Sequence, residues 1–233
     1  MERATSPEPR AGLPAARRPP PPASWELYLV TDRHQTGDRD LLEVVSHAVR
    51  GGLRAVQLRE KDLSTRDLYR LAERLLDITR TAGIALLIND RVDVALALDA
   101  DGVHLTRRSL PPKAARDLLG PGKLIGISCH SLADVQEAVA DGVDFVVLGP
   151  IYATPSKVGY GPPVTTALLR EARSVCSLPL LAIGGIKAAQ VPAVMASGAD
   201  GIAAISAVMS APDPAMATRE ILSAVSRARG ATN

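Results

Sequence analysis

Eight short apolar segments, separated by stretches of helical periodicity, constrain the fold of this chain more than any other feature. In chain order they are LYLVTD, AVQLRE, ALLIND, GVHLT, LIGIS, FVVLGPI, PLLAIGGI and GIAAIS. Continuous runs rich in Val, Ile and Leu are typical of parallel strands that are buried on both faces of a sheet. The pattern therefore predicts an α/β fold with eight strands.

The stretches between these strands carry helix-boundary signals. Ser64 is a suitable N-cap and Gly83 a suitable C-terminal residue for a segment in which Leu68 and Leu75 fall at helical spacing, and Ser131 begins a similar segment. Strands joined through helices pair in parallel, and eight such units that close on themselves form a (β/α)8 TIM barrel. The alternative, a doubly wound open sheet, would need a glycine-rich turn where the chain has TDRHQTGDRD.

Length and composition favour one domain with a tail. The chain has 233 residues, of which 46% are hydrophobic, and this suffices for a single barrel over residues 25–233. Residues 1–24 are rich in Pro, Ala and Arg, so we expect a disordered extension. This segment has no apolar core of a signal peptide, and no run of about 18 apolar residues predicts a membrane span.

Charge and cysteine content limit the partners that we expect. The net charge of +2 is small and no block of like charges occurs, so neither a nucleic-acid partner nor a membrane is expected. Cys129 and Cys176 lack metal-ligand or CxxC spacing, which favours reduced thiols in a cytoplasmic protein. Nothing in the sequence assigns an oligomeric state.

Polar residues gather where the predicted strands end. They are Asp32 and Arg33; Gln57, Arg59, Glu60 and Lys61; Asn89, Asp90 and Arg91; His104, Arg107, Arg108 and Ser109; Ser128 and His130; Thr154, Ser156 and Lys157; Gly184 and Gly185; and Ser206. In a TIM barrel the active site lies at the C-terminal ends of the strands. We therefore expect these side chains to surround one site.

Three cations indicate an anionic substrate. Strand alternation turns Gln57 and Arg59 toward the barrel interior, and a charge there needs a partner of opposite sign. Together with Lys61 and Lys157, Arg59 predicts a substrate with more than one negative charge. The alternative is internal salt bridges to the nearby acids Glu60, Asp62 and Asp90.

Two further features suggest phosphate chemistry. Gly184 and Gly185 let a backbone approach an anion closely, and Ser206 ends the next strand, where phosphate-binding barrels hold a phosphoryl group.

Asp90, beside Asn89, either ligates Mg²⁺, or pairs with a neighbouring cation, or caps the following helix. His104 and His130 are either acid/base groups or hydrogen-bonded structural residues.

The motifs YLVTDR, QLREKD, LLINDRVDVALALDADGVHL, IGISCHS, ADGVDFVVLGPIYATPSK, LLAIGGI and GADGIAAISA resemble those of the thiamine phosphate synthase family, which includes thiazole tautomerase relatives. The resemblance implies a transferase of thiamine biosynthesis that couples hydroxymethylpyrimidine diphosphate to thiazole phosphate and releases diphosphate with the assistance of Mg²⁺. It implies a pyrimidine diphosphate site formed by Gln57, Leu58, Arg59, Glu60, Lys61, Asn89, Ser128 and Lys157. It implies a thiazole phosphate site formed by Thr154, Pro155, Ser156, Gly185, Ile205 and Ser206, with Asp90 as the Mg²⁺ ligand.

One position departs from the family pattern. Ser109 stands where family synthases usually have an aspartate that is a second Mg²⁺ ligand. The chain keeps Lys61 and Asp90, which tautomerase relatives usually lack, and this favours the synthase, in which Arg59, Lys61 and Lys157 would neutralise the leaving diphosphate. The alternatives are a tautomerase, in which His130 would carry the proton, and a non-catalytic barrel that binds thiamine phosphates.

Overall fold

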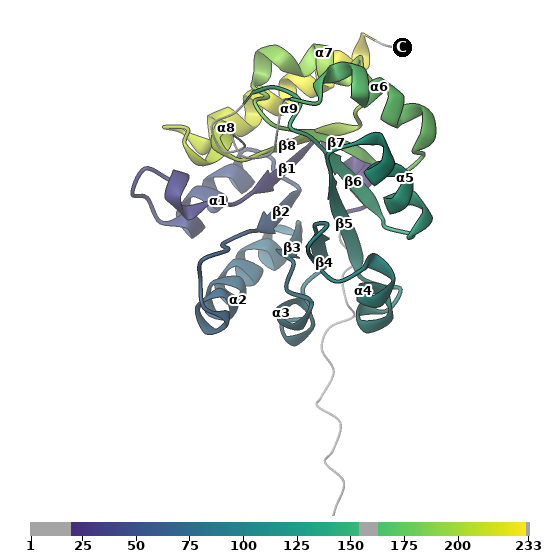
Figure 1. Cartoon of the computed structure of the whole chain (residues 1–233). Helices are drawn as coiled ribbons and strands as arrows, with labels where there is room; N and C mark the ends of the chain where they lie inside the picture. The colour runs from purple at the N-terminus through teal and green to yellow at the C-terminus, as the bar shows by residue number, and fades with distance from the viewer. Residues whose placement is uncertain (1–19, 154–162, 232–233) are drawn as a thin grey trace, which may run out of the picture.

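The structure is a closed barrel of parallel strands surrounded by helices (Figure 1). It is a computed structural model that describes residues 20–153 and 163–231. Each strand pairs in parallel with the next one, and the pairing of the first with the last closes the ring. The strands are β1 (Leu27–Val30), β2 (Ala55–Leu58), β3 (Ala85–Asn89), β4 (Gly102–Leu105), β5 (Leu124–Cys129), β6 (Phe145–Leu148), β7 (Leu180–Ile183) and β8 (Gly201–Ala204). The TIM-barrel prediction is confirmed, and the open-sheet alternative is wrong.

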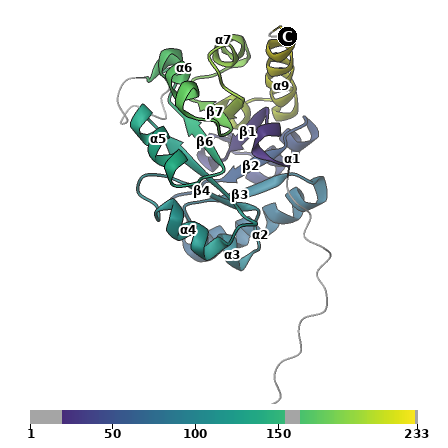
Figure 2. The ribbon, with the colours of Figure 1, turned by 90° about the vertical axis from the view of Figure 1, so that its right-hand side faces the viewer.

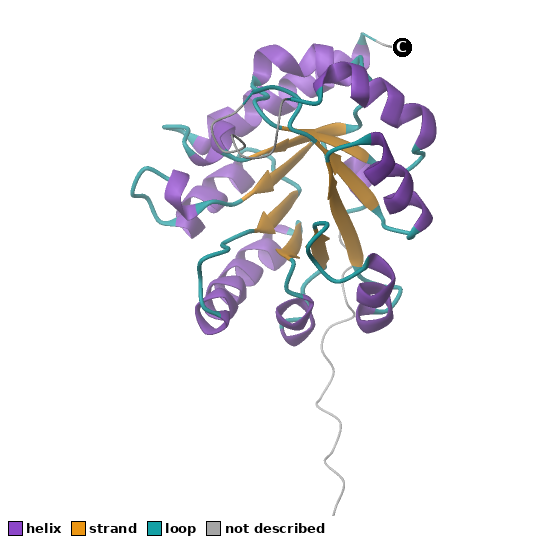
Figure 3. Cartoon of the chain, in the orientation of Figure 1, coloured by secondary structure: helices purple, strands orange, loops and turns teal. Residues whose placement is uncertain are grey.

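Helices form the outer layer (Figure 3), and α5 and α6 lie side by side in both views of the chain (Figures 1 and 2). They are α1 (Leu41–Arg50), α2 (Thr65–Ala82), α3 (Val92–Ala97), α4 (Pro112–Leu119), α5 (Leu132–Ala140), α6 (Thr165–Val175), α7 (Val191–Met195), α8 (Ser206–Met209) and α9 (Pro214–Gly230). Ser64 and Ser131 cap α2 and α5 through their side chains, and Gly83 ends α2 with a φ of 72°. The predicted helix boundaries at these residues are confirmed.

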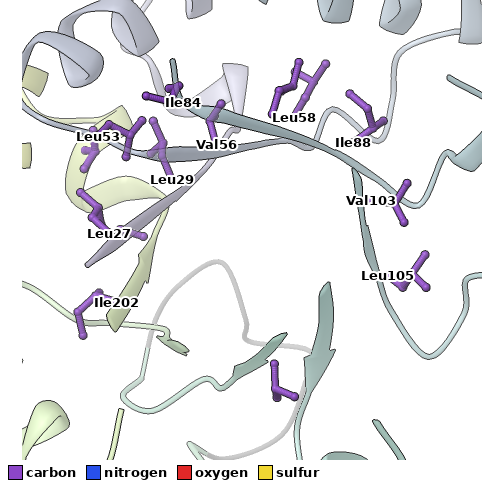
Figure 4. Close-up of a cluster of buried hydrophobic side chains, with 14 of the residues drawn as sticks. Leu27, Leu29, Leu53, Val56, Leu58, Ile84, Ile88, Val103, Leu105 and Ile202 are labelled. Carbon is purple, nitrogen blue, oxygen red and sulfur yellow. The ribbon is translucent and has the colours of Figure 1, made fainter. Parts of the chain in front are cut away.

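Alternation along the strands produces two apolar cores. Leu29, Val56, Leu58, Ile88 and Val103 belong to the larger core, which includes buried residues of the surrounding helices (Figure 4). Intervening strand residues form a second core with Trp25, which lies two residues before the first strand. The outward position of Leu58 therefore leaves its neighbour Gln57 facing inward, as predicted.

Aromatic rings fill the interior at the end where the strands begin. Trp25 stacks on Tyr28 with ring centroids 5.3 Å apart, and Phe145 packs edge-on against both. Gly126 makes room for this cluster, because a Cβ there would lie 2.1 Å from the Phe145 ring. The aromatic cluster therefore fills this end of the barrel interior.

Aspartates brace the starts of alternate strands. Asp101, Asp144 and Asp200 each accept a hydrogen bond from the backbone N–H at or next to the first residue of the preceding strand, at 2.6–2.8 Å. Arg116 pairs with Asp144, and Arg173 pairs with Asp200. These contacts hold the beginnings of neighbouring strands in register.

The structure describes the segment that leads into the barrel from residue 20 onward. A 3-10 turn spans Pro22–Ser24, and the Trp25 indole N–H donates a hydrogen bond of 3.0 Å to the Pro20 carbonyl. The predicted tail, 1–24, therefore includes residues that pack on the barrel, because the buried Trp25 side chain anchors them. Residues 1–19 lie outside the described part of the chain. None of the helices described is long and apolar enough to cross a membrane.

Candidate active site

A cavity of about 510 Å³ opens at the C-terminal ends of the strands, and we call it the central cavity. Its lining residues are Val30, Asp32, Gln35, Gln57, Arg59, Lys61, Asn89, His104, Thr106, Arg107, Arg108, Ser128, His130, Val147, Ile183 and Ile205. All eight strands, or the loops that follow them, contribute to this set. The structure thus brings together the predicted Gln57, Arg59, Lys61, Asn89 and Ser128.

Two smaller hollows adjoin the central cavity. The Asp90 hollow, about 380 Å³, is lined by Asp90 and Arg91 and shares Lys61 and Arg108 with the central cavity. The Gly185 hollow, about 300 Å³, is lined by the predicted Gly184, Gly185 and Ser206 and shares Ile205 with it. Three connected spaces at one rim suit a reaction between two anionic substrates.

A chain of polar contacts forms the floor of the central cavity. The Gln57 side-chain N–H donates to the Tyr28 hydroxyl at 3.2 Å, and this hydroxyl lies 3.5 Å from Nδ1 of His104. Nε2 of His104 lies 2.9 Å from Oγ of Ser128. Burial raises the pKa of Tyr28 far above its usual value, so the phenol stays neutral. His104 is buried within this chain of contacts and lies against Ser128 at the cavity wall, so it is hydrogen-bonded as one of the two predicted alternatives requires.

The predicted cations at the end of β2 have no acidic partner within the barrel as described. No ion pair or side-chain hydrogen bond engages Arg59 or Lys61 in residues 20–153 and 163–231. The acids between and after them, Glu60 and Asp62, bind Arg33 instead. The predicted alternative of internal salt bridges to these acids is therefore wrong for Arg59 and Lys61.

Asp90 stands at the rim in a left-handed backbone conformation, with φ 65°. The N-cap position of α3 is Arg91, and that guanidinium pairs with Asp93 rather than with Asp90. Across the described ranges, the Asp90 carboxylate makes no hydrogen bond or ion pair, so neither the capping nor the pairing alternative is realised. An exposed carboxylate without a partner, beside the Asn89 amide, fits the ligand preference of Mg²⁺.

The described residues contain no group of three or more His, Cys, Asp or Glu side chains arranged to hold a metal ion. Magnesium commonly uses one or two protein carboxylates and completes its shell with substrate phosphates and water. The residues at the Asp90 hollow fit this ion in that mode, in which most ligands come from the substrate.

The loop after β4 departs from the family pattern at Ser109, and its side chains are used locally. Oγ of Ser109 accepts a hydrogen bond of 2.8 Å from the Thr106 backbone N–H, which closes a turn. Arg107 pairs with Asp134 of α5. Arg108 has no side-chain partner in the part of the chain that is described, and it lines both the central cavity and the Asp90 hollow. Arg107 is therefore held in an ion pair, whereas Arg108 adds positive charge to the rim.

His130 is oriented by two contacts at the end of β5. Its Nδ1 lies 2.5 Å from the Gly149 carbonyl oxygen, which can only accept, so Nδ1 carries the proton. Its backbone N–H donates to the Asp134 carboxylate at 2.8 Å. Burial raises the pKa of Asp134, but this bond, a bond from Ser131 and the Arg107 charge outweigh it, and the pKa is lowered on balance. The site thus holds a fixed imidazole on its wall.

The Gly185 hollow depends on backbone conformations that favour glycine. Gly184 and Gly185 have φ of 104° and 65°. A Cβ on Gly184 would lie 2.5 Å from Cβ of Pro150, and one on Gly185 would lie 2.8 Å from the Ala153 carbonyl oxygen. The glycines therefore keep this hollow open, next to Ser206 at the start of α8.

Some predicted site residues do not point into the central cavity. Leu58 is fully buried in the outer core, and the Glu60 carboxylate accepts hydrogen bonds from Thr31 and Arg33. Both line the Asp90 hollow, so their part in the site stays a prediction. The predicted Thr154, Pro155, Ser156 and Lys157 lie outside the described residues.

Sequence reasoning missed several lining residues, namely Val30, Gln35, Thr106, Val147 and Ile183. It also missed Tyr28 as a member of the cavity floor. The strand YLVTD offered a signal, because a tyrosine in an inward-facing strand position must place its hydroxyl next to a polar partner. Its partner His104 is 76 positions away, which no local pattern reveals.

Comparisons with known proteins agree over most of the chain. A family profile described as thiamine monophosphate synthase matches residues 27–208. The thiamine-phosphate synthase of Roseiflexus castenholzii is 46% identical over 195 residues, which cover 84% of this chain and 86% of that protein. The thiamine-phosphate synthase of Moorella thermoacetica is 43% identical over 206 residues, or 88% and 98% of the two chains. A solved structure described as thiamine phosphate pyrophosphorylase from Pyrococcus furiosus has a TM-score of 0.80 and 35% identity, and covers 89% of this chain and 98% of that one.

Proposed function

Because the chain belongs to the thiamine monophosphate synthase family, we propose that it joins hydroxymethylpyrimidine diphosphate to thiazole phosphate and releases diphosphate. The bond between the pyrimidine methylene carbon and the diphosphate oxygen breaks, and the electron pair leaves with the diphosphate. The thiazole nitrogen supplies the electron pair of the new C–N bond, so no redox partner and no side-chain nucleophile is needed. The enzyme is thus a transferase of small phosphorylated substrates in thiamine biosynthesis.

The observation that carries the proposal is the pair of cations at the end of β2. Arg59 and Lys61 line the central cavity, and no acid among the described residues neutralises them. A leaving diphosphate accumulates negative charge as the bond breaks, and fixed cations stabilise it without reorganisation. Lys157, outside the described residues, is proposed as the third cation, as the family resemblance implies.

Magnesium is proposed as the cofactor, with Asp90 as its protein ligand. The exposed, unpaired carboxylate and the neighbouring Asn89 fit the ion, and bound Mg²⁺ would supply further neutralisation of the diphosphate. Lys61 and Arg108 share this hollow with Asp90. The chain would therefore supply one anionic ligand, Asp90, in a hollow that also contains cations. The substrate and water would supply the remaining ligands of the metal ion.

The other predicted residues divide between the two substrates. We assign Gln57, Asn89 and Ser128 to the pyrimidine side, because they line the central cavity. Gly185, Ile205 and Ser206 are assigned to the thiazole phosphate, since they line the adjoining hollow. Thr154, Pro155 and Ser156 remain predicted contacts of this second substrate.

The comparisons support the synthase over the other two functions considered. The Roseiflexus castenholzii and Moorella thermoacetica relatives are named as synthases, and they are 46% and 43% identical to this chain. A non-catalytic barrel would not need Lys61 and Asp90 together without partners at one rim.

A cytoplasmic location is part of this proposal. Cys129 and Cys176 are buried and free, and burial raises the pKa of the Cys129 thiol to about 12. Such thiols persist in a reducing compartment.

The proposal is tested with the purified full-length chain, both substrates and Mg²⁺. We expect thiamine phosphate and diphosphate to form in equal amounts, and EDTA to stop the reaction. A parallel assay supplies a thiazole carboxylate phosphate and follows its isomerisation. Absence of product from the two synthase substrates, or a rate that EDTA leaves unchanged, would refute the synthase assignment.

A further inference from the structure

The segment that follows β2 alternates cations and acids, and this raises a problem of charge. Residues 59–62 read Arg, Glu, Lys, Asp. Carboxylates this close in sequence would be expected to pair with Arg59 and Lys61 and so weaken the attraction of both for an anion. In the structure neither cation pairs with Glu60 or Asp62.

A single residue from the preceding βα loop binds both acids. Arg33, in the loop after β1, donates from Nη1 to Oδ1 of Asp62 at 2.6 Å and from Nη2 to Oδ2 at 2.5 Å. The same Nη1 donates to Oε2 of Glu60 at 3.2 Å, and the Arg33 backbone N–H donates to this oxygen at 3.1 Å. The fork of the guanidinium allows these contacts at once, which a point charge does not.

The two acids depend on Arg33 to different degrees. The Glu60 side chain is 1% exposed and also accepts a 2.7 Å bond from the Thr31 hydroxyl, so it stays anchored without the Arg33 side chain. Asp62 is 54% exposed, and its one other side-chain partner among the described residues is His34. The Arg33 guanidinium is the main cause of the lowered pKa of Asp62. Asp62 is therefore the acid that loss of Arg33 would release.

We propose that Arg33 is a positioning residue of the reaction, which holds Asp62 and Glu60 away from Arg59 and Lys61 so that both cations remain available to the diphosphate. The inference rests on the proposed function for the identity of the anion. Arg33 itself does not line the central cavity, and it acts through the residues that do.

The test measures binding of inorganic diphosphate, with Mg²⁺ present, to the full-length protein by calorimetry. Arg33→Gln releases Asp62, which then competes for Lys61, and we expect about tenfold weaker binding, equivalent to one charge-assisted contact. Asp62→Asn alone leaves the cations unpaired and binds within about twofold of the wild type. The double variant Arg33→Gln with Asp62→Asn regains most of the lost affinity, because the competing charge is gone.

Two further variants separate positioning from general stability. Arg33→Lys retains a cation but not the fork, and we expect intermediate binding. Arg116→Gln breaks a comparable pair with Asp144, 2.6 Å long, at the other end of the barrel. It lowers the midpoint of thermal unfolding without changing diphosphate affinity.

The inference is overturned if Arg33→Gln binds diphosphate as the wild type does, or if the double variant binds as weakly as Arg33→Gln. The second result would show that Arg33 only maintains the loop. Diphosphate binding requires no turnover, so a chain that fails the synthase assay but shows rescue in the double variant would refute the proposed function and support this inference. A wild type that binds no diphosphate overturns both.

Discussion

At the scale of single residues, the partner of each side chain determines its role more than its chemical type. Arg33, Arg91 and Arg107 lie near the rim, but each is engaged by an acid of its own. Arg59 and Lys61, from the same region, have no such partner in the described structure. The positive charge available to a substrate is therefore what remains after the internal ion pairs have formed.

Asp90 is the carboxylate to which this reasoning assigns the magnesium ion. Asp90→Asn keeps a residue that tolerates the left-handed backbone but removes the negative charge. We expect synthase activity to fall on the order of 10²-fold and the Mg²⁺ dependence to shift to higher concentration. Steady-state rates measured against Mg²⁺ concentration check this prediction.

The matched control is Asp93→Asn, since Asp93 is a nearby carboxylate that pairs with Arg91. It should leave the Mg²⁺ dependence unchanged. If Asp90→Asn and Asp93→Asn change the Mg²⁺ dependence of the rate to the same extent, Asp90 is not the metal ligand.

At the scale of helices and strands, the N-terminal ends of the strands carry contacts that stabilise the fold, and the C-terminal ends carry the candidate active site. The N-terminal ends carry Asp101, Asp144 and Asp200, each on a backbone N–H next to a strand start. The C-terminal ends carry the cavity and its unpaired charges. A substitution at one end should therefore affect stability, and one at the other should affect activity.

Asp144 offers a direct test of this division. Asp144→Ala leaves the Ile125 N–H without its 2.6 Å acceptor and Arg116 without its ion-pair partner. We expect the free energy of unfolding to fall by about 1–3 kcal/mol, while kcat stays near that of the wild type. Urea unfolding and the synthase assay measure the two quantities.

Lys113→Ala serves as the comparison, because Lys113 makes an exposed pair with Asp141 at 3.4 Å. Its effect should be below about 1 kcal/mol. A large decrease in the kcat of Asp144→Ala, measured under conditions where the variant is still folded, would contradict the proposed division.

Local sequence patterns predicted the elements well and the contacts between them poorly. The N-caps Ser64 and Ser131 were predictable because each cap accepts a hydrogen bond from a backbone N–H only three residues away. The inward position of Gln57 followed from strand alternation. The engagement of Asp62 by Arg33 was not predictable, since the pair is 29 residues apart and forms only when β1 and β2 lie side by side.

Ser109 shows a different limit. The sequence identified it as a departure from the family pattern but did not show what its hydroxyl does. In the structure it closes a turn with Thr106, so its bond is to the backbone of its own loop. The sequence shows that an aspartate is absent at this position. Only the loop geometry shows that the Ser109 hydroxyl instead binds the Thr106 backbone N–H.

At the scale of the whole molecule, the barrel is closed at one end and open at the other. The rings of Trp25, Tyr28 and Phe145 fill the interior near the strand starts. Polar residues replace them toward the strand ends, where Gln57 and His104 form the floor of the cavity. The same alternation of side chains therefore builds a core and a site within one barrel.

The carboxyl groups also predict how global stability varies with pH. Among the residues that the structure describes, four have a lowered pKa, because ion pairs or backbone hydrogen bonds outweigh burial: Asp62, Asp93, Asp134 and Asp213. Their stabilising contribution is complete above the unfolded pKa of about 4 and is lost as the pH falls through the folded values. Burial raises the pKa of Asp101 and acts in the opposite direction, but it is one group against four.

We therefore expect the urea midpoint to decrease as the pH is lowered from about 5 to 3. Measurements across this range at constant ionic strength check the direction. A midpoint that stays constant or increases would show that these groups do not favour the folded state.

The central claim is that the unpaired cations of the open end neutralise a leaving diphosphate, and Lys61 tests it most directly. Lys61 is exposed and without an ion-pair partner in the described structure, so Lys61→Gln should fold as the wild type does. The measurement is the rate of diphosphate release from the two synthase substrates at saturating Mg²⁺. The account predicts a decrease in kcat on the order of 10²-fold with an unchanged unfolding midpoint, and a kcat within about threefold of the wild type would contradict it.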